Sequence, residues 1–308
     1  MSLSVRSFPE LRSRLTAMGR RVRVVVCRPA DAHTLQAVLE SVRLGFVHAL
    51  LVGEYDAATL AAAPPEVRAE VECVPAADAA DAMQRAVQLV HDGEGDVLMK
   101  GLVNSDDLLR HILNKTYGLR PAGAVITHAS VVSLPGFDRL VVLSDVAVIP
   151  YPTLEQRAAQ LDYTIALSRT LGTACPRVAL LHCTENVSEA FPVTLDYVEL
   201  CRRAVAGEWG EVLVDGPLDL LCALSPEGLA DKGLESPLEG RADVLIVPDI
   251  EAGNVLYKTL GLLVPGARFA SLLCGTTHPV VLTSRGDSVD VKIDSLALAA
   301  LRVLAGAC

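Results

Sequence analysis

Short apolar runs alternate with longer amphipathic stretches over the first 113 residues of the chain. The runs are rich in valine and leucine, as in strands that are buried on both faces of a parallel sheet. Between them, apolar residues recur at helical spacing. The predicted strands are 22–27, 49–52, 71–75 and 96–99, and the predicted helices are 32–44, 78–91 and 105–113. This alternation predicts a doubly wound α/β sheet with right-handed crossovers.

The pattern changes after residue 125, where closely spaced strand-like runs separated by Gly and Pro predict a domain crossover with a hairpin. The α/β alternation then returns. The predicted helices are 153–171, 194–206 and 293–304, and the predicted strands are 178–182, 212–215, 243–247 and 269–273. We therefore predict two α/β domains, one made of residues 1–127 with 282–308 and the other of residues 128–281. Ligands of such sheets bind at the carboxyl ends of the strands.

Composition excludes several classes of protein. A chain of 308 residues with 51% hydrophobic residues is long enough for two cores. Its formal net charge of −10 argues against a nucleic-acid partner. No apolar run reaches the roughly 20 residues that span a membrane, and the N-terminal segment lacks the apolar stretch of a signal peptide. The eight cysteines have no metal-like spacing, so we expect reduced thiols, no metal site and a cytoplasmic protein.

Motifs for nucleotide binding and covalent catalysis are absent from the sequence. No GxGxxG follows the first predicted strand, and no GxxxxGK[ST] occurs. There is also no GxSxG elbow and no recognisable cysteine nucleophile motif. The sequence therefore gives no support to P-loop kinases or to covalent catalysis.

Two strand-to-helix junctions carry groups that bind anions. Thr283, Ser284 and Arg285 follow an apolar run and supply two hydroxyls and a guanidinium, which match phosphate or carboxylate oxygens. Asn254 and Lys258 lie one turn apart at the start of a predicted helix, whose N-terminus favours anions. Each pattern also fits a structural alternative, namely a solvated surface charge or a helix cap.

Other polar residues interrupt apolar segments. Lys100 ends a predicted strand, where it can bind a ligand or extend to solvent. Thr127 and His128 lie at the predicted crossover, and His128 can orient an oxygen, move a proton, or be packed at a domain boundary. Asp145 lies between apolar runs, where an unpaired carboxylate is costly, which favours a structural pair with an arginine or lysine.

Several segments in a consistent order resemble the phosphate acetyl/butyryltransferase family, and the match extends from about Asp96 to Ala300. Two of these motifs, Met-Lys-Gly-Leu-Val and Ile-Glu-Ala-Gly-Asn-Val-Leu-Tyr-Lys, resemble the butyryl-type branch of the family more than the acetyl-type branch. The segments are 96–103, 145–155, 215–218, and the pair 248–258 and 279–288.

The resemblance implies a two-domain fold like that of isocitrate and isopropylmalate dehydrogenases, an interdomain cleft and a homodimer. It implies transfer of a short-chain acyl group between coenzyme A and inorganic phosphate, with coenzyme A as a substrate and no tightly bound cofactor. Ser284 and Arg285 match the serine–arginine pair at the reacting end of acetyl-type sites. The candidate substrate-binding residues are then Lys100, Thr127, His128, Asn254, Lys258 and Thr283.

The sequence departs from the acetyl-type pattern at Val291, which aligns with the aspartate that deprotonates the coenzyme A thiol. We predict Asp290 as the catalytic replacement, with Asp287, or positioning and charge stabilisation alone, as alternatives. Val291 also motivates a second hypothesis, a module that senses acyl-CoA or acyl phosphate without turnover. A third, a metal- and nicotinamide-dependent decarboxylating dehydrogenase of the same fold, is disfavoured by the missing nucleotide motifs and metal-binding aspartates.

Overall fold

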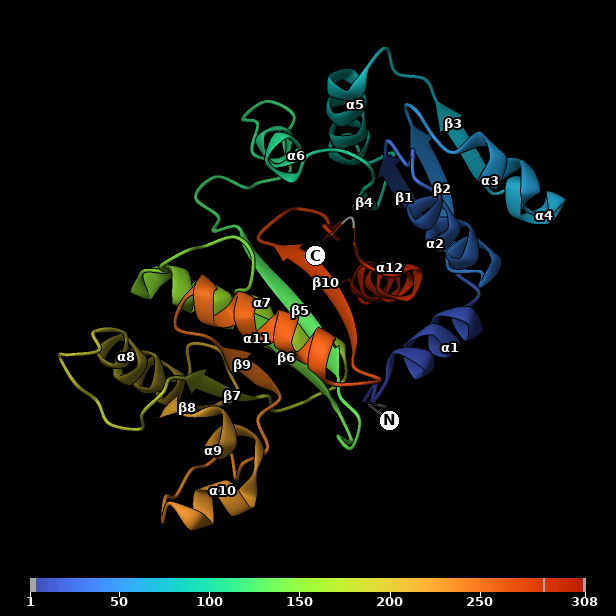
Figure 1. Ribbon diagram of the computed structural model, residues 1–308. Helices are drawn as coiled ribbons and strands as arrows, with labels where there is room; N and C mark the ends of the chain where they lie inside the picture. The colour runs from blue at the N-terminus through green and yellow to red at the C-terminus, as the bar shows by residue number, and fades with distance from the viewer. Residues whose placement is uncertain (1–3, 285, 307–308) are drawn as a thin grey trace. The chain divides into compact units, whose positions relative to one another are not determined.

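The computed structural model describes residues 4–284 and 286–306, which form two compact units (Figure 1). The first unit comprises Phe8–Ile126 and the chain from Phe269 onward, and the second comprises Thr127–Arg268 with the residues up to Ser7. No helix in the described part of the chain is long and apolar enough to cross a membrane.

The strands of the first unit lie in the order β3-β2-β1-β4-β11-β10. Neighbours are parallel except for β10 and β11, which are antiparallel. The chain returns to this unit at Phe269, earlier than the predicted residue 282, because β10 pairs with β11. The strands are β1 (Val22–Cys27), β2 (Val47–Val52), β3 (Val71–Val74), β4 (Val97–Lys100), β10 (Arg268–Cys274) and β11 (Val280–Val281).

Register and helix caps bring several chain segments to one edge of this sheet. Cys27 lies opposite Lys100, so β1 and β4 end side by side. The next helix after β1, α2, is capped by Asp31, whose carboxylate accepts a hydrogen bond from the Thr34 N–H at 2.8 Å. The long helix α12 packs against α1 and α2 and is buried over ten successive residues, 292–301. The helices are α1 (Phe8–Met18), α2 (Ala32–Arg43), α3 (Ala57–Ala62), α4 (Pro65–Arg68), α5 (Ala79–His91), α6 (Ser105–Ile112) and α12 (Val289–Leu304).

The strands of the second unit lie in the order β5-β6-β9-β7-β8. The antiparallel pair β5 and β6 is the hairpin that the sequence predicted, and the other neighbours are parallel. The strands are β5 (Thr127–Ser133), β6 (Leu140–Ser144), β7 (Arg177–Leu181), β8 (Leu213–Leu218) and β9 (Val244–Ile246). The helices are α7 (Leu154–Thr170), α8 (Val193–Val205), α9 (Leu220–Leu224), α10 (Pro226–Asp231) and α11 (Ile250–Leu263). The predicted α/β class is confirmed.

Candidate active site

A pocket of about 250 Å³ lies in the first unit, where β1 and β4 end. Its walls come from the start of α2, the end of β4 with the residues after it, the residues after β11, and α12. This edge is where parallel α/β sheets bind their ligands. The lining residues are Asp31, Ala32, His33, Thr34, Lys100, Gly101, Leu102, Thr283, Ser284 and Lys292.

Two buried ammonium groups make this pocket cationic. Lys100 is 4% exposed, and its Nζ donates to the carbonyl oxygens of Gly101 at 3.4 Å and Thr283 at 3.5 Å. Lys292 is 2% exposed, and its Nζ donates to the carbonyl oxygens of Ser284 at 3.3 Å and Asp287 at 2.7 Å. Burial lowers the pKa of Lys292, and the carboxylates of Asp287 and Asp31 oppose this shift. Both lysines therefore approach the same strand end.

The turn after β11 presents Ser284 to this pocket. The Ser284 N–H donates to Asp287 Oδ2 at 2.7 Å, and its exposed Oγ accepts a bond from the Gly286 N–H at 3.4 Å. These two bonds hold the turn from within. Thr283, just before it, is buried in the pocket wall. The predicted Arg285 lies outside the described residues.

Gly101 sets how closely β4 approaches β1 at the pocket. Its N–H donates to the Cys27 carbonyl at 2.9 Å. A Cβ atom at Gly101 would lie 2.4 Å from the carbonyl oxygen of Arg28 and 2.5 Å from that of Cys27. Only glycine allows this approach without a backbone shift. The position of Lys100 thus depends on its glycine neighbour.

Asp290 points toward α1. Its carboxylate accepts a hydrogen bond from Arg12 Nη2 at 2.9 Å, and its side chain is 67% exposed. Arg12 also pairs with the buried Asp294 at 2.7 Å. Asp290 is not among the residues that line the pocket. Its bond to Arg12 joins α12 to α1.

In the second unit, Thr127 and His128 lie beside Asp145, whose buried carboxylate accepts five hydrogen bonds. The Thr127 hydroxyl donates at 2.6 Å and the His128 N–H at 3.2 Å. Three successive backbone N–H groups, those of residues 147–149, donate at 2.8, 3.0 and 3.2 Å. Among the described residues, backbone and hydroxyl donors thus take the place of the arginine or lysine that the sequence favoured. His128 is itself buried.

Helix α11 packs closely on the segment after Asp145. A Cβ atom at Gly253 would lie 2.3 Å from the Asp145 carbonyl oxygen. The next residue, Asn254, donates from Nδ2 to the Val146 carbonyl at 3.0 Å, so its amide is used in holding the helix. Lys258 lies one turn further along α11, and its side chain is exposed.

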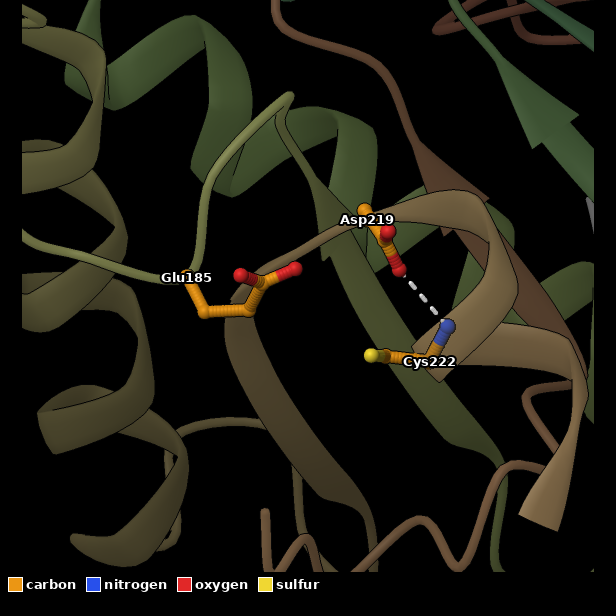
Figure 2. A group of neighbouring side chains, drawn as sticks. All are labelled: Glu185, Asp219 and Cys222. Carbon is orange, nitrogen blue, oxygen red and sulfur yellow. Dashed lines mark hydrogen bonds between the residues drawn. The ribbon is translucent and has the colours of Figure 1, made fainter. Parts of the chain in front are cut away.

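Figure 2 shows Glu185, Asp219 and Cys222, whose ligand atoms lie within 4.8 Å of one another. Lys232 already binds both carboxylates, with Nζ 2.7 Å from Glu185 and 2.7 Å from Asp219. Burial, together with Asp219, raises the pKa of the Cys222 thiol to about 11, which keeps the sulfur protonated at neutral pH. An ammonium ion therefore neutralises this group, and its residues do not fit a metal centre.

Lys292 is the pocket residue that the sequence reasoning missed. It lies in the first turns of α12, between Asp290 and Asp294, in a helix that is otherwise mostly apolar or small. A lysine within such a buried face is rare unless it is paired. This irregularity in the apolar pattern was the available signal.

The fold and the pocket define an α/β protein with a lysine-lined pocket at its strand ends. Residues 66–300 match the family described as "Phosphate acetyl/butaryl transferase". A phosphate butyryltransferase from Clostridium acetobutylicum is 36% identical over 96% of this chain and 98% of its own length. A phosphate acetyltransferase from Thermotoga maritima is 35% identical over 92% of this chain and 96% of its own length. The chain belongs to the phosphate acetyl/butyryltransferase family of acyltransferases, as its sequence motifs predicted.

Solved structures share this fold. A branched-chain phosphotransacylase from Enterococcus faecalis superposes with a TM-score of 0.80 and 29% identity, covering 92% of this chain and 99% of that one. EutD phosphotransacetylase from Staphylococcus aureus, at 20% identity and a TM-score of 0.77, shares the fold over 96% of this chain and 99% of its own. A putative 4-hydroxythreonine-4-phosphate dehydrogenase from Salmonella typhimurium, at 16% identity and a TM-score of 0.51 over 91% of this chain and 99% of its own, relates this fold to the dehydrogenase-like class predicted from the sequence.

Proposed function

We propose that this protein converts a short-chain acyl-CoA and inorganic phosphate into an acyl phosphate and coenzyme A, and catalyses the reverse reaction. The observation that carries this proposal is the pocket in which two buried lysines lie beside Ser284. Such a site suits an anionic nucleophile, because ammonium groups and hydroxyls bind phosphate oxygens through charge-assisted bonds. Coenzyme A enters as a substrate, and the reaction needs no tightly bound cofactor.

The proposed reaction is a direct displacement in a ternary complex. A phosphate oxygen attacks the thioester carbonyl, the new C–O bond forms, and the C–S bond breaks to release the thiolate of coenzyme A. The Ser284 hydroxyl and Arg285 would stabilise the negative charge that develops, an effect of about 3 to 4 kcal/mol for one well-placed donor. The roles of Ser284 and Arg285 rest on the sequence match.

The remaining predicted site residues have different prospects. Thr283 and Lys100 line the pocket, and we propose that they contact substrate there. Thr127 and Asn254 are bonded to protein groups, so we propose that they act by holding their segments in place. His128 and Lys258 stay predicted substrate contacts.

Asp290 stays our predicted base for the thiol. Because Arg12 binds its carboxylate, this role requires that coenzyme A approach the exposed side of that ion pair. Asp290→Asn should then lower the rate at which coenzyme A reacts with acyl phosphate by about 10²-fold or more, the usual contribution of a general base. Unchanged turnover in a folded variant would remove Asp290 from the mechanism and leave displacement by positioning and charge, since a thiol ionises partly near neutral pH.

The proposal is tested by measuring released thiol from acetyl-, propionyl-, butyryl- and branched acyl-CoA in phosphate, with arsenate as a second nucleophile. We expect turnover with at least one of these substrates. Arg285→Ala and Ser284→Ala should each lower it by about 10²-fold or more, whereas Lys115→Met, at an exposed lysine in the same unit, should not change it. Binding of acyl-CoA without thiol release would favour the sensing module instead.

We also propose a cytoplasmic homodimer. Helix α11 exposes Val255, Leu262 and Leu263, at 65%, 83% and 68%, and exposed apolar side chains that are close together are typical of protein interfaces. The seven cysteines that lie in the described residues form no disulfide bond with one another, as in a reducing compartment. Light scattering of the purified protein should give twice the mass of the chain. A monomer at micromolar concentration would contradict the dimer.

A further inference from the structure

The chain has five lysines, and the structure distributes them unequally. Three of them, Lys115, Lys232 and Lys258, are exposed. The other two, Lys100 and Lys292, are buried, and both line the same pocket. Lysine is rarely fully buried, so two buried lysines that line one pocket concentrate positive charge there.

The contacts of Lys292 are those of a cation held by dipoles. Its Nζ donates to the carbonyl oxygens of Ser284 and Asp287, and the described residues give it no carboxylate within ion-pair distance. An ammonium group has three donors, so these two bonds leave one N–H for the pocket that the side chain lines. The carboxylates of Asp287 and Asp31 also favour the charged form of Lys292, from beyond ion-pair distance.

We propose that Lys292 is a further substrate-binding residue, whose ammonium group binds inorganic phosphate in this pocket together with Lys100. This assignment rests on the proposed function and adds a residue to its site. Lys100 donates to the carbonyl oxygen of Thr283, and Lys292 donates to the carbonyl oxygen of Ser284. The two ammonium groups therefore bind neighbouring backbone carbonyls. The start of α2 also lines this pocket, and there the Asp31 carboxylate already accepts the Thr34 N–H at 2.8 Å, so the two lysines have to supply the charge that attracts phosphate.

Lys292 also holds the turn that carries Ser284, because it bonds the carbonyls at both ends of that turn. A purely structural clamp and a phosphate ligand predict different effects. Loss of a clamp would disturb the whole site, including acyl-CoA binding. Loss of a phosphate ligand would weaken phosphate binding selectively, so the KM for phosphate would rise while the KM for acyl-CoA would change little.

The first experiment uses the full-length wild-type protein, labelled at its lysines with ¹³C and ¹⁵N and titrated with inorganic phosphate. With five lysines, each side-chain signal can be assigned by single Lys→Arg variants. We expect the signals of Lys292 and Lys100 to shift with one saturating curve, while that of Lys115 stays fixed. A Lys292 signal that does not move at saturating phosphate would overturn the proposal, and the titration itself is carried out on the wild-type protein.

The second experiment compares Lys292→Met, Lys292→Arg and Lys115→Met by calorimetry with inorganic phosphate and by steady-state kinetics. Lys292→Met should bind phosphate about 10- to 100-fold more weakly, as expected for one charged hydrogen bond. Lys292→Arg should restore part of the affinity, and Lys115→Met should match the wild type. Wild-type phosphate affinity in folded Lys292→Met would refute the role of Lys292.

These outcomes separate the two proposals. A wild-type protein that releases no thiol from any acyl-CoA would refute the proposed function, while the phosphate-dependent signal of Lys292 would still establish the anion site. Normal turnover with unaltered phosphate binding in Lys292→Met would refute the role of Lys292 and leave the acyltransferase function in place.

Discussion

Replacing Asp145 by asparagine should destabilise the second unit, because this carboxylate joins the start of β5 to the segment after β6. Its Oδ1 accepts two N–H groups, those of Ala147 and Val148. Its Oδ2 accepts three donors, from Thr127, His128 and Ile149. Asparagine keeps one acceptor oxygen and replaces the other with a donor group, so at least two donors lose their acceptor. At about 1 to 3 kcal/mol for each buried unsatisfied donor, the expected loss is about 2 to 6 kcal/mol.

Urea unfolding followed by circular dichroism measures this loss. The matched control is Asp138→Asn in the same unit, where an exposed carboxylate pairs with Arg139 and Arg241 and the change should cost less than about 1 kcal/mol. Thr127→Val should cost about 1 kcal/mol, since it removes one of the five hydrogen bonds. An Asp145→Asn variant as stable as Asp138→Asn would refute the view that this carboxylate organises the segment.

Three further changes concern the first unit. Gly101→Ala places a Cβ atom 2.4 Å from the Arg28 carbonyl oxygen, so thermal unfolding should show a loss of about 1 to 3 kcal/mol and calorimetry a weaker affinity for phosphate. Arg12→Met removes the ion pair to the buried Asp294, which should cost about 3 kcal/mol, and a loss below 1 kcal/mol would contradict this estimate. Burial lowers the pKa of Lys292 in the folded protein, so the unfolded chain binds this proton more tightly. The free energy of unfolding of the wild type should therefore rise, relative to that of Lys292→Met, as pH increases from neutral toward about 10.4. Urea titrations that show the opposite slope would contradict this prediction.

The fold was largely predictable because buried parallel strands leave a simple signal. The apolar run 22–27 is β1, and the amphipathic stretch 32–44 differs from α2 by one residue. Lys100 and Ser284 meet in one pocket for a topological reason, since β4 and β11 are neighbouring parallel strands that end at the same edge. Strand order of this kind follows from the general rules for α/β sheets.

Two features were not predictable because they depend on backbone geometry. The sequence favoured a charged partner for Asp145, but the loop 147–149 folds back so that its N–H groups supply the compensation. Lys292 was overlooked because its burial is a consequence of how α12 packs against α1 and α2. A sequence pattern shows that a lysine interrupts an apolar helix, but it does not show which carbonyl oxygens accept hydrogen bonds from its ammonium group.

The burial of Lys100 and Lys292 has a chemical consequence for an enzyme of this proposed type. An acyl phosphate is an activated acyl donor, and a neutral lysine amine is a nucleophile that it can acylate. The chain carries five lysines and twenty-two arginines, so most of its positive charge resides on guanidinium groups, which stay protonated. Among the lysines, Lys115, Lys232 and Lys258 present an amine to solvent, whereas Lys100 and Lys292 line the pocket in which the proposed product forms. A protein so composed offers few lysine side chains to acyl phosphate that has left the site.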